Sequence, residues 1–198
     1  MSLRYDASQN AGPLQQGEIL ADIWELRPRH PTIEPPESVQ VDSLWHEYMI
    51  AMSSACDLEF DFKARFPQEE IQETADESPF EAEQPKKIVP YVLLCDGYQE
   101  SKIRNLADLK TKGALDHIDR NQDERYHHLA AGPIGESEEV ILPDLYLDFK
   151  KIVALPTGSI YEGIRRGGIT RVAVVRPPYL QNLTHRLYSF LSRVGIPD

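Results

Sequence analysis

The sequence lacks long apolar runs. Among its 198 residues the longest apolar stretches reach only five to seven residues and each is interrupted, whereas a bilayer-spanning helix needs roughly 20. Residues 1–16 also lack the basic-then-apolar order of a secretory signal. From these two absences we expect a cytoplasmic protein that does not associate with membranes.

Cysteine is scarce, and glycine-rich phosphate-binding motifs are missing. The two cysteines, Cys56 and Cys95, could form at most one disulfide, and without an export signal we expect both thiols to be reduced. The glycine-containing stretch at 163–168 lacks the spacing and the lysine of a P-loop. Hydrolysis of ATP or GTP is therefore not expected, and no cofactor is predicted.

Basic residues are absent between residues 66 and 85, a stretch that carries seven acidic residues. Such a composition buries too little apolar surface to offset the entropy lost on ordering. We therefore predict a mobile acidic insertion at 66–86 in a surface loop. An alternative is that this segment mimics a phosphate backbone or shields a basic surface.

Positive charge is concentrated near the end of an acidic chain. Net charge is −11, but residues 149–198 hold eight Lys and Arg against two Asp and Glu, while residues 1–148 hold thirteen against thirty. This balance argues against general coating of nucleic acid, yet a local patch could still contact phosphate. The candidates are Arg165, Arg166, Arg171 and Arg176, together with Arg186 and Arg193 of the predicted C-terminal helix. Alternatively, these arginines pair with acidic residues of the same fold.

The hydrophobic pattern predicts one α+β domain over residues 1–198. Strands are expected at 17–26, 46–53, 88–94, 125–129, 140–155 and 171–175. A middle helix is expected at 98–112, a short helix at 158–164 and an amphipathic C-terminal helix at 177–194. Residues 1–15 are expected to form a loose arm, and the proline-rich segment 27–38 a long loop. The predicted architecture is a curled antiparallel sheet forming an SH3-like barrel.

Two Cys-Asp pairs each follow a strand-like apolar run. Cys56-Asp57 follows the run that begins at Tyr48, and Cys95-Asp96 follows the run that begins at Val89. Side chains at strand ends can converge at the rim of a sheet. We therefore expect a thiol and carboxylate rim that could bind, catalyse or cap turns.

Part of the N-terminal region resembles the MazF/PemK-like proteins. The resemblance covers about 45 residues, through QGEILADIWEL from Gln16 and HEYMIAMSSACDLEF from His46. It implies an SH3-like barrel and a toxin-type ribonuclease activity, but Glu47 stands where those enzymes place an arginine. The Ser53-x-x-Cys56-Asp57 element is also similar to that of a group of small uncharacterised bacterial proteins, and so is the Arg-Val-Gly-Ile-Pro segment at 193–197.

Metal binding is a weaker interpretation. Cys56, Asp57, Cys95, Asp96, His127 and His128 are types of residue that bind zinc, and Asp144, Asp148 and Lys150 could support magnesium chemistry. Neither cysteine belongs to a Cys-x-x-Cys pair, and adjacent histidines on a strand point to opposite faces. We expect no metal site.

Two functions remain open from the sequence. The leading hypothesis is a non-enzymatic interaction or regulatory protein that binds a protein partner or nucleic acid through Ser54, Cys56, Cys95, Asp96 and the C-terminal arginines. The alternative is a metal-independent endoribonuclease with His46 or Asp57 as base, Ser53 for positioning and Arg27 or Arg29 as the cation. A homodimer formed through the C-terminal helix is a third possibility.

Overall fold

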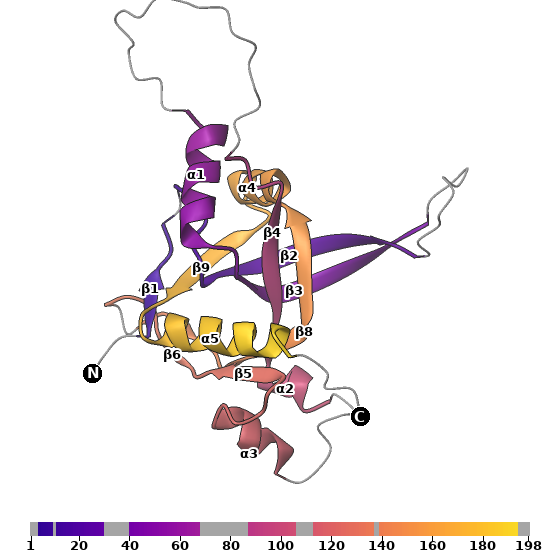
Figure 1. The fold of residues 1–198 in the computed structure, drawn as a ribbon, viewed down its shortest axis with the longest axis vertical. Coiled ribbons are helices and arrows are strands. Elements are labelled where there is room, and N and C mark those ends of the chain that lie inside the picture. The colour runs from indigo at the N-terminus through magenta and orange to yellow at the C-terminus, as the bar shows by residue number, and fades with distance from the viewer. Residues whose placement is uncertain are drawn as a thin grey trace, which may run out of the picture.

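The computed structural model of the chain describes residues 4–9, 11–29, 40–67, 87–105, 113–136 and 139–193. It shows an α+β fold built on a mostly antiparallel sheet, as the hydrophobic pattern predicts (Figure 1). Within these ranges, no helix is both long and apolar enough to cross a membrane.

The main sheet has seven strands and is open. In spatial order these are β1 (Tyr5–Ala7), β9 (Thr170–Val175), β2 (Glu18–Pro28), β3 (Val41–Ala51), β4 (Tyr91–Gln99), β8 (Leu145–Pro156) and β5 (Tyr126–Leu129). Each neighbouring pair is antiparallel. Because β1 and β5 are edges and do not pair with each other, the sheet does not close, and the predicted SH3-like barrel is not confirmed. A second, two-stranded sheet joins β6 (Gly132–Pro133) to β7 (Ile141–Leu142).

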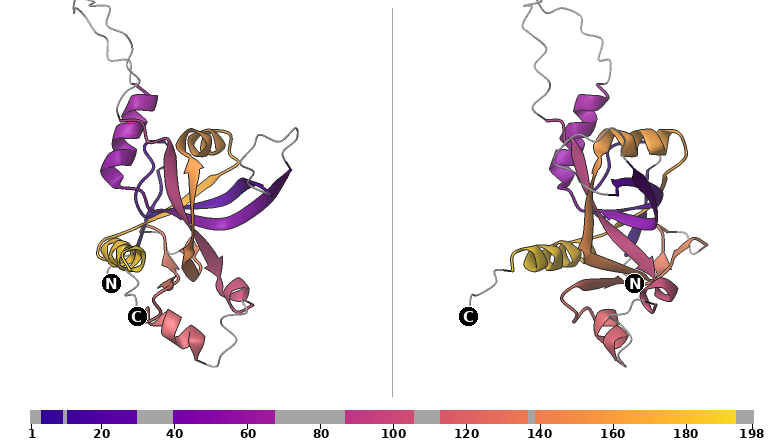
Figure 2. Two further views of the ribbon diagram at one scale, coloured as in Figure 1. Left: turned by 45° about the vertical axis from the view of Figure 1, so that its right-hand side comes forward. Right: turned by 90° about the vertical axis from the view of Figure 1, so that its right-hand side faces the viewer.

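Helices bury both faces of the central sheet (Figure 2). Consecutive strand residues point to opposite faces, so Ile19 and Leu20 belong to different cores, as do Met49 and Ile50. Helix α5 (Tyr179–Leu191) covers one face, while α1 (Ala55–Arg65) and α4 (Thr157–Arg165) cover the other. This two-sided burial explains why the central strands are nearly continuously apolar.

A smaller cluster lies beside the end of the sheet. Helices α2 (Glu100–Ile103) and α3 (Ala114–Asp119) supply Ile103 and Ile118, which pack with Tyr126 and Tyr146. Of the middle helix predicted at 98–112, residues 106–112 lie outside the described residues.

Strands β2 and β3 extend beyond the sheet as a two-stranded ribbon (Figures 1 and 2). Strand β9 pairs with β2 only from Glu18 to Ala21, and β4 pairs with β3 only from Tyr48 to Ala51. Residues 22–28 and 41–47 therefore pair only with each other among the described strands. We call residues 22–28 and 41–47 the ribbon.

Several segments differ from their predicted form. Residues 4–9 and 11–15 are not a loose arm in the structure, because Tyr5 pairs with β9 and both Tyr5 and Leu14 are buried. Arg27 and Pro28 extend β2, while residues 30–38 of the predicted loop lie outside the described part. Residues 68–86 of the predicted acidic insertion also lie outside it.

Candidate binding site at the base of the ribbon

The two Cys-Asp pairs do not form a common rim. Strand β3 ends at Ala51, and Cys56 and Asp57 belong to the first turn of α1. Cys95 and Asp96 lie within β4, which continues to Gln99. The strand continues through a carboxylate because Asp96 finds hydrogen-bond partners there in His46 and Tyr98. The rim prediction is therefore wrong.

The two thiols also differ in their surroundings. Cys56 is exposed, whereas Cys95 is fully buried, and both are free. The Cys95 thiol donates a hydrogen bond to the Asp148 carbonyl oxygen at 3.5 Å. Burial raises the pKa of Cys95, and the neighbouring carboxylates of Asp96 and Asp148 raise it further. Cys95 is thus a neutral thiol of the core.

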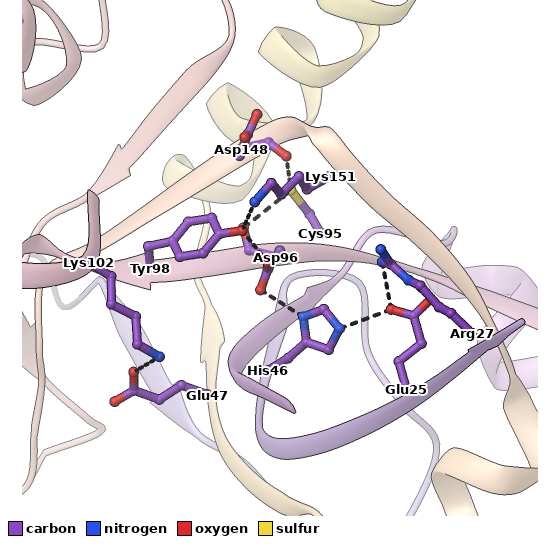
Figure 3. Close-up of polar contacts among 10 residues, drawn as sticks. All are labelled: Glu25, Arg27, His46, Glu47, Cys95, Asp96, Tyr98, Lys102, Asp148 and Lys151. Atoms are coloured by element: carbon purple, nitrogen blue, oxygen red, sulfur yellow. Dashed lines mark hydrogen bonds and ion pairs between the residues drawn. The ribbon is translucent and has the colours of Figure 1, made fainter. Parts of the chain in front are cut away.

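His46 lies between two buried carboxylates (Figure 3). Its Nδ1 is 3.0 Å from Asp96 Oδ1, and its Nε2 is 3.0 Å from Glu25 Oε2. A neutral imidazole has one N–H, so it would leave a lone pair facing one of these oxygens. The geometry therefore favours the imidazolium form, which donates to both.

The pKa of His46 agrees with this geometry. The hydrogen bond to Asp96 raises the pKa of His46, burial opposes the increase, and Glu25 adds to it. Burial acts to raise the pKa of Glu25, but hydrogen bonds from Arg27 and His46 outweigh burial and lower it. The His46 imidazolium and the Glu25 carboxylate therefore stabilise each other in their charged forms.

The hydrogen bonds continue on both sides of this triad. Arg27 donates to Glu25 through Nε at 2.5 Å and Nη2 at 2.7 Å. On the other side the Tyr98 hydroxyl donates to Asp96 and accepts from Lys151 Nζ at 2.7 Å. We call the chain of Arg27, Glu25, His46, Asp96, Tyr98 and Lys151 the His46 network. It links the ribbon to β4 and β8.

A cavity of about 460 Å³ opens beside this network, between β3 on one side and β4 and β8 on the other. Its lining includes Arg27, Trp45, Tyr98, Lys102, Lys150 and Lys151. Four of these residues are cationic: Arg27, Lys102, Lys150 and Lys151. The carboxylates in the lining are those of Glu47 and Asp96. We call this space the ribbon cavity; it concentrates positive charge in a chain whose net charge is −11.

The face of the ribbon that carries the two tryptophans is apolar and exposed, and one of them, Trp45, also reaches the edge of the ribbon cavity. Trp24 and Trp45 are register partners, so their side chains leave the same face, with exposed fractions of 63% and 42%. Leu26 and Val41 share that face by strand alternation and are 68% and 54% exposed. These two tryptophans are the only ones in the sequence. Lys102 Nζ lies 4.7 Å from the centre of the Trp45 ring.

The residues proposed for ribonuclease chemistry do not form one site. Arg27 and His46 share the ribbon cavity, but Ser53 and Asp57 line a different cavity of about 900 Å³. Ser53 Oγ accepts a hydrogen bond from the Leu93 amide at 2.9 Å. Arg29 pairs with Asp42 at 2.7 Å on the exposed ribbon. Both ring nitrogens of His46 are engaged, so it has no free nitrogen to serve as a base.

The remaining predicted binding residues are spread over the molecule. Arg165 and Arg166 both pair with Glu162, and Arg176 pairs with Asp6. Arg171 is buried, where it binds Glu18 and the carbonyl oxygens of Gly12 and Pro13. Ser54 precedes α1 without capping it through its side chain. Arg165, Arg166, Arg171 and Arg176, four of the arginines predicted to bind an anion, thus have partners within the fold.

Three of the potential metal ligands, His128, Asp144 and Asp148, are engaged by protein groups. His128 Nε2 lies 2.7 Å from Asp144 Oδ1, and Asp148 forms a two-point ion pair with Arg125. His127 is buried, and within the described part its Nδ1 has no hydrogen-bond partner. Burial lowers the pKa of His127 to about 3, so this ring is neutral.

Sequence reasoning identified Arg27, His46 and Asp96 but missed Glu25, Tyr98, Lys151 and the two tryptophans. One signal was available: residues 24–27 alternate Trp, Glu, Leu and Arg. On a strand this pattern gives one apolar face and one charged face. Whether each face is exposed or buried depends on where the neighbouring strands end, and the sequence does not show where they end.

The chain has no significant match among protein-family models, curated proteins or solved structures. Function must therefore be inferred from the geometry of the chain itself.

Proposed function

We propose that the chain is a non-enzymatic binding module that contacts a macromolecular partner, a protein or a nucleic acid, through the ribbon. The observation that carries this proposal is the exposure of both tryptophans, side by side on one face of a projecting element. Tryptophan is usually well buried, and contiguous exposed apolar surface is typical of interaction sites. Tryptophan is also among the residues that contribute most to binding energy at interfaces.

The His46 network supports the proposal by holding the ribbon in place. An isolated two-stranded hairpin is marginally stable in water. Here hydrogen bonds join ribbon residues Glu25, Arg27 and His46 to Asp96 on β4, and through Tyr98 to Lys151 on β8. A rigid ribbon loses less conformational freedom on binding than a flexible loop would.

The ribonuclease alternative receives less support from the same contacts. Arg27 and His46 lie near one another, but Arg27 is bound to Glu25 and His46 is bound on both nitrogens. General base catalysis requires a nitrogen within hydrogen-bond reach of the substrate. We accordingly assign His46 a structural role that positions the ribbon.

Photo-crosslinking tests the proposal. A benzophenone amino acid is placed at Leu26 in the full-length chain, which is expressed in its native cells; the matched control carries it at Phe60, an exposed residue of α1. We expect discrete crosslinked species from position 26 that are absent from position 60. Digestion with protease or ribonuclease then identifies the class of partner.

Two results would contradict the proposal. Identical crosslinking patterns from both positions would show that the ribbon is not a preferred contact surface. Cleavage of a mixed-sequence RNA by the purified chain in EDTA, abolished by Arg27→Ala/Arg29→Ala, would instead establish the ribonuclease alternative.

A further inference from the structure

The outer edge of β3 is open along the ribbon. One edge of β3 pairs with β2 along the ribbon, and the other pairs with β4 only from Tyr48 to Ala51. Within the described residues, no strand pairs with the outer edge over Val41–Glu47, which is seven residues long. A free edge of this length presents a row of backbone N–H and C=O groups that can pair with another strand.

The ribbon cavity borders this open edge. Leu44, Trp45, His46 and Glu47 of β3 form one wall of the cavity. Lys150 and Lys151 lie on the opposite side, on β8. Lys150 is exposed and has no ion pair within the described part of the chain, while Lys151 Nζ bonds only to a tyrosine hydroxyl there. Both amines can therefore still take a carboxylate partner.

The two faces of the ribbon offer different chemistry to an added strand. The face with Trp24, Leu26, Val41 and Trp45 is apolar. The other face carries Arg27 and His46 and adjoins the lysines of the cavity. Because side chains of a strand alternate between faces, a strand added to β3 would place every second residue against each face.

We propose that the outer edge of β3 binds an extended peptide segment of a partner protein as an additional strand, with acidic residues toward the ribbon cavity and apolar residues toward the tryptophan face. This proposal rests on the ribbon being the binding surface, as argued above, and specifies its partner. Strand addition takes affinity from main-chain hydrogen bonds and specificity from the alternating side chains.

The chemistry favours a peptide over a nucleic acid. The open edge presents the backbone N–H and C=O of every second residue, along a strand that rises about 3.3 Å per residue. A peptide matches this spacing with its own donors and acceptors. A nucleic acid lacks these backbone groups and carries a charge at every phosphate, so the net charge of −11 opposes it more than it opposes a short peptide with a carboxylate at every second residue.

A designed peptide provides a direct test with the full-length chain. The probe is an acetylated and amidated octapeptide that alternates Glu and Val. One control replaces every Glu by Lys, and a second keeps the side chains but methylates the backbone nitrogen of alternate residues. Fluorescence reports binding, because the only two tryptophans lie on the ribbon. Slowed amide exchange over residues 41–47 locates the added strand.

We expect the acidic octapeptide to change the tryptophan fluorescence and to protect amides of residues 41–47. The methylated peptide should bind about tenfold more weakly or worse, since it loses several main-chain hydrogen bonds. The Lys150→Glu/Lys151→Glu variant should lose about tenfold or more in affinity. The matched variant Arg165→Glu/Arg166→Glu, on exposed α4, should bind as the wild type does.

Four results would overturn strand addition, and they separate it from the proposed function. Equal binding of the methylated and unmethylated peptides would show contact by side chains alone. Binding of a single-stranded RNA decamer in place of the peptide would identify a nucleic acid as the partner. Concentration-dependent self-association with protection of residues 41–47 would identify a second copy of the chain. In both cases the ribbon remains the binding surface. If no probe affects the tryptophans and position 26 gives no specific crosslink, the proposed function fails as well.

Discussion

Strands β2 and β3 have two parts that differ in burial, although both parts carry large apolar side chains. In the part embedded in the sheet, Leu20 and Ile50 are fully buried between helices. Six residues along β2, Leu26 is 68% exposed on the ribbon. Leu20 and Leu26 are both leucines of one strand, so residue type does not decide their burial; the neighbours that reach each part of the strand decide it.

This comparison separates stability from function. Apolar side chains in the embedded part stabilise the fold by leaving water, at about 25 cal/mol per Å² of buried apolar surface. Ile23 of the ribbon is buried in the same way, but Trp24, Leu26 and Val41 stay mostly exposed and gain little of this stabilisation in the isolated chain. Binding of a partner would bury these exposed side chains, which is why we propose the binding surface there.

Breaking the His46 network, which links the ribbon to the embedded part of the sheet, should have the largest effect on stability. His46→Ala leaves the buried carboxylates of Glu25 and Asp96 without their shared cation. We expect a loss of about 3 to 5 kcal/mol in the free energy of unfolding, the usual cost of removing one partner of a buried ion pair. Urea denaturation measures it. The control His185→Ala, on exposed α5 surface, should change stability by under about 0.5 kcal/mol; equal losses in both variants would show that the network does not stabilise the fold.

A matched pair of leucine substitutions tests the comparison itself. Leu20→Ala should lower the free energy of unfolding by about 2 to 5 kcal/mol, because it leaves a cavity in the core. Leu26→Ala should change it by under about 0.5 kcal/mol. Binding of the acidic octapeptide should weaken in Leu26→Ala and persist in Leu20→Ala under conditions where that variant is folded. A larger loss of stability in Leu26→Ala than in Leu20→Ala would contradict the division between a part that stabilises the fold and a part that binds. Weaker binding by Leu20→Ala than by Leu26→Ala would contradict it as well.

Local patterns predicted much of the fold. The strands at 17–26, 125–129 and 171–175 and the C-terminal helix have clear periodicity, and the structure contains β2, β5, β9 and α5 in these places. Helix α1 was missed because its core-facing residues are Leu58, the acidic Asp61 and the partly buried Phe62, which do not make a clear apolar stripe in the sequence. The resemblance to MazF/PemK-like proteins and the homodimer remain predictions.

The candidate site was only partly predictable, for a different reason. Glu25, His46 and Asp96 come from three strands, β2, β3 and β4. Their meeting depends on register, which places Ile23 opposite His46 and Met49 opposite Asp96. A register shift of one residue would turn the histidine or a carboxylate to the other face. Residue types therefore pointed to His46 and Asp96, while tertiary pairing decided which residues surround them.

The smallest predicted effect concerns pH and isolates the charge of His46. Its raised pKa means that its stabilisation is present below the unfolded value of 6.5 and is lost as pH rises through the folded pKa. His127 acts in the opposite direction, because its pKa is lowered to about 3 and its contribution is lost as pH falls below 6.5. The total pH profile therefore mixes two opposing trends, which a single variant can separate.

The informative quantity is the difference in unfolding free energy between the wild type and His46→Gln, measured by urea denaturation across pH. His127 is common to both proteins and cancels. Glu25, with its lowered pKa, keeps its carboxylate charged above 4.5, so the difference should be largest between pH 4.5 and 6.5. It should then shrink as pH rises and the imidazolium loses its proton. A difference that stays constant as pH rises would show that His46 holds the ribbon as a neutral ring, and that the cation between Glu25 and Asp96 is not what joins the ribbon to the sheet.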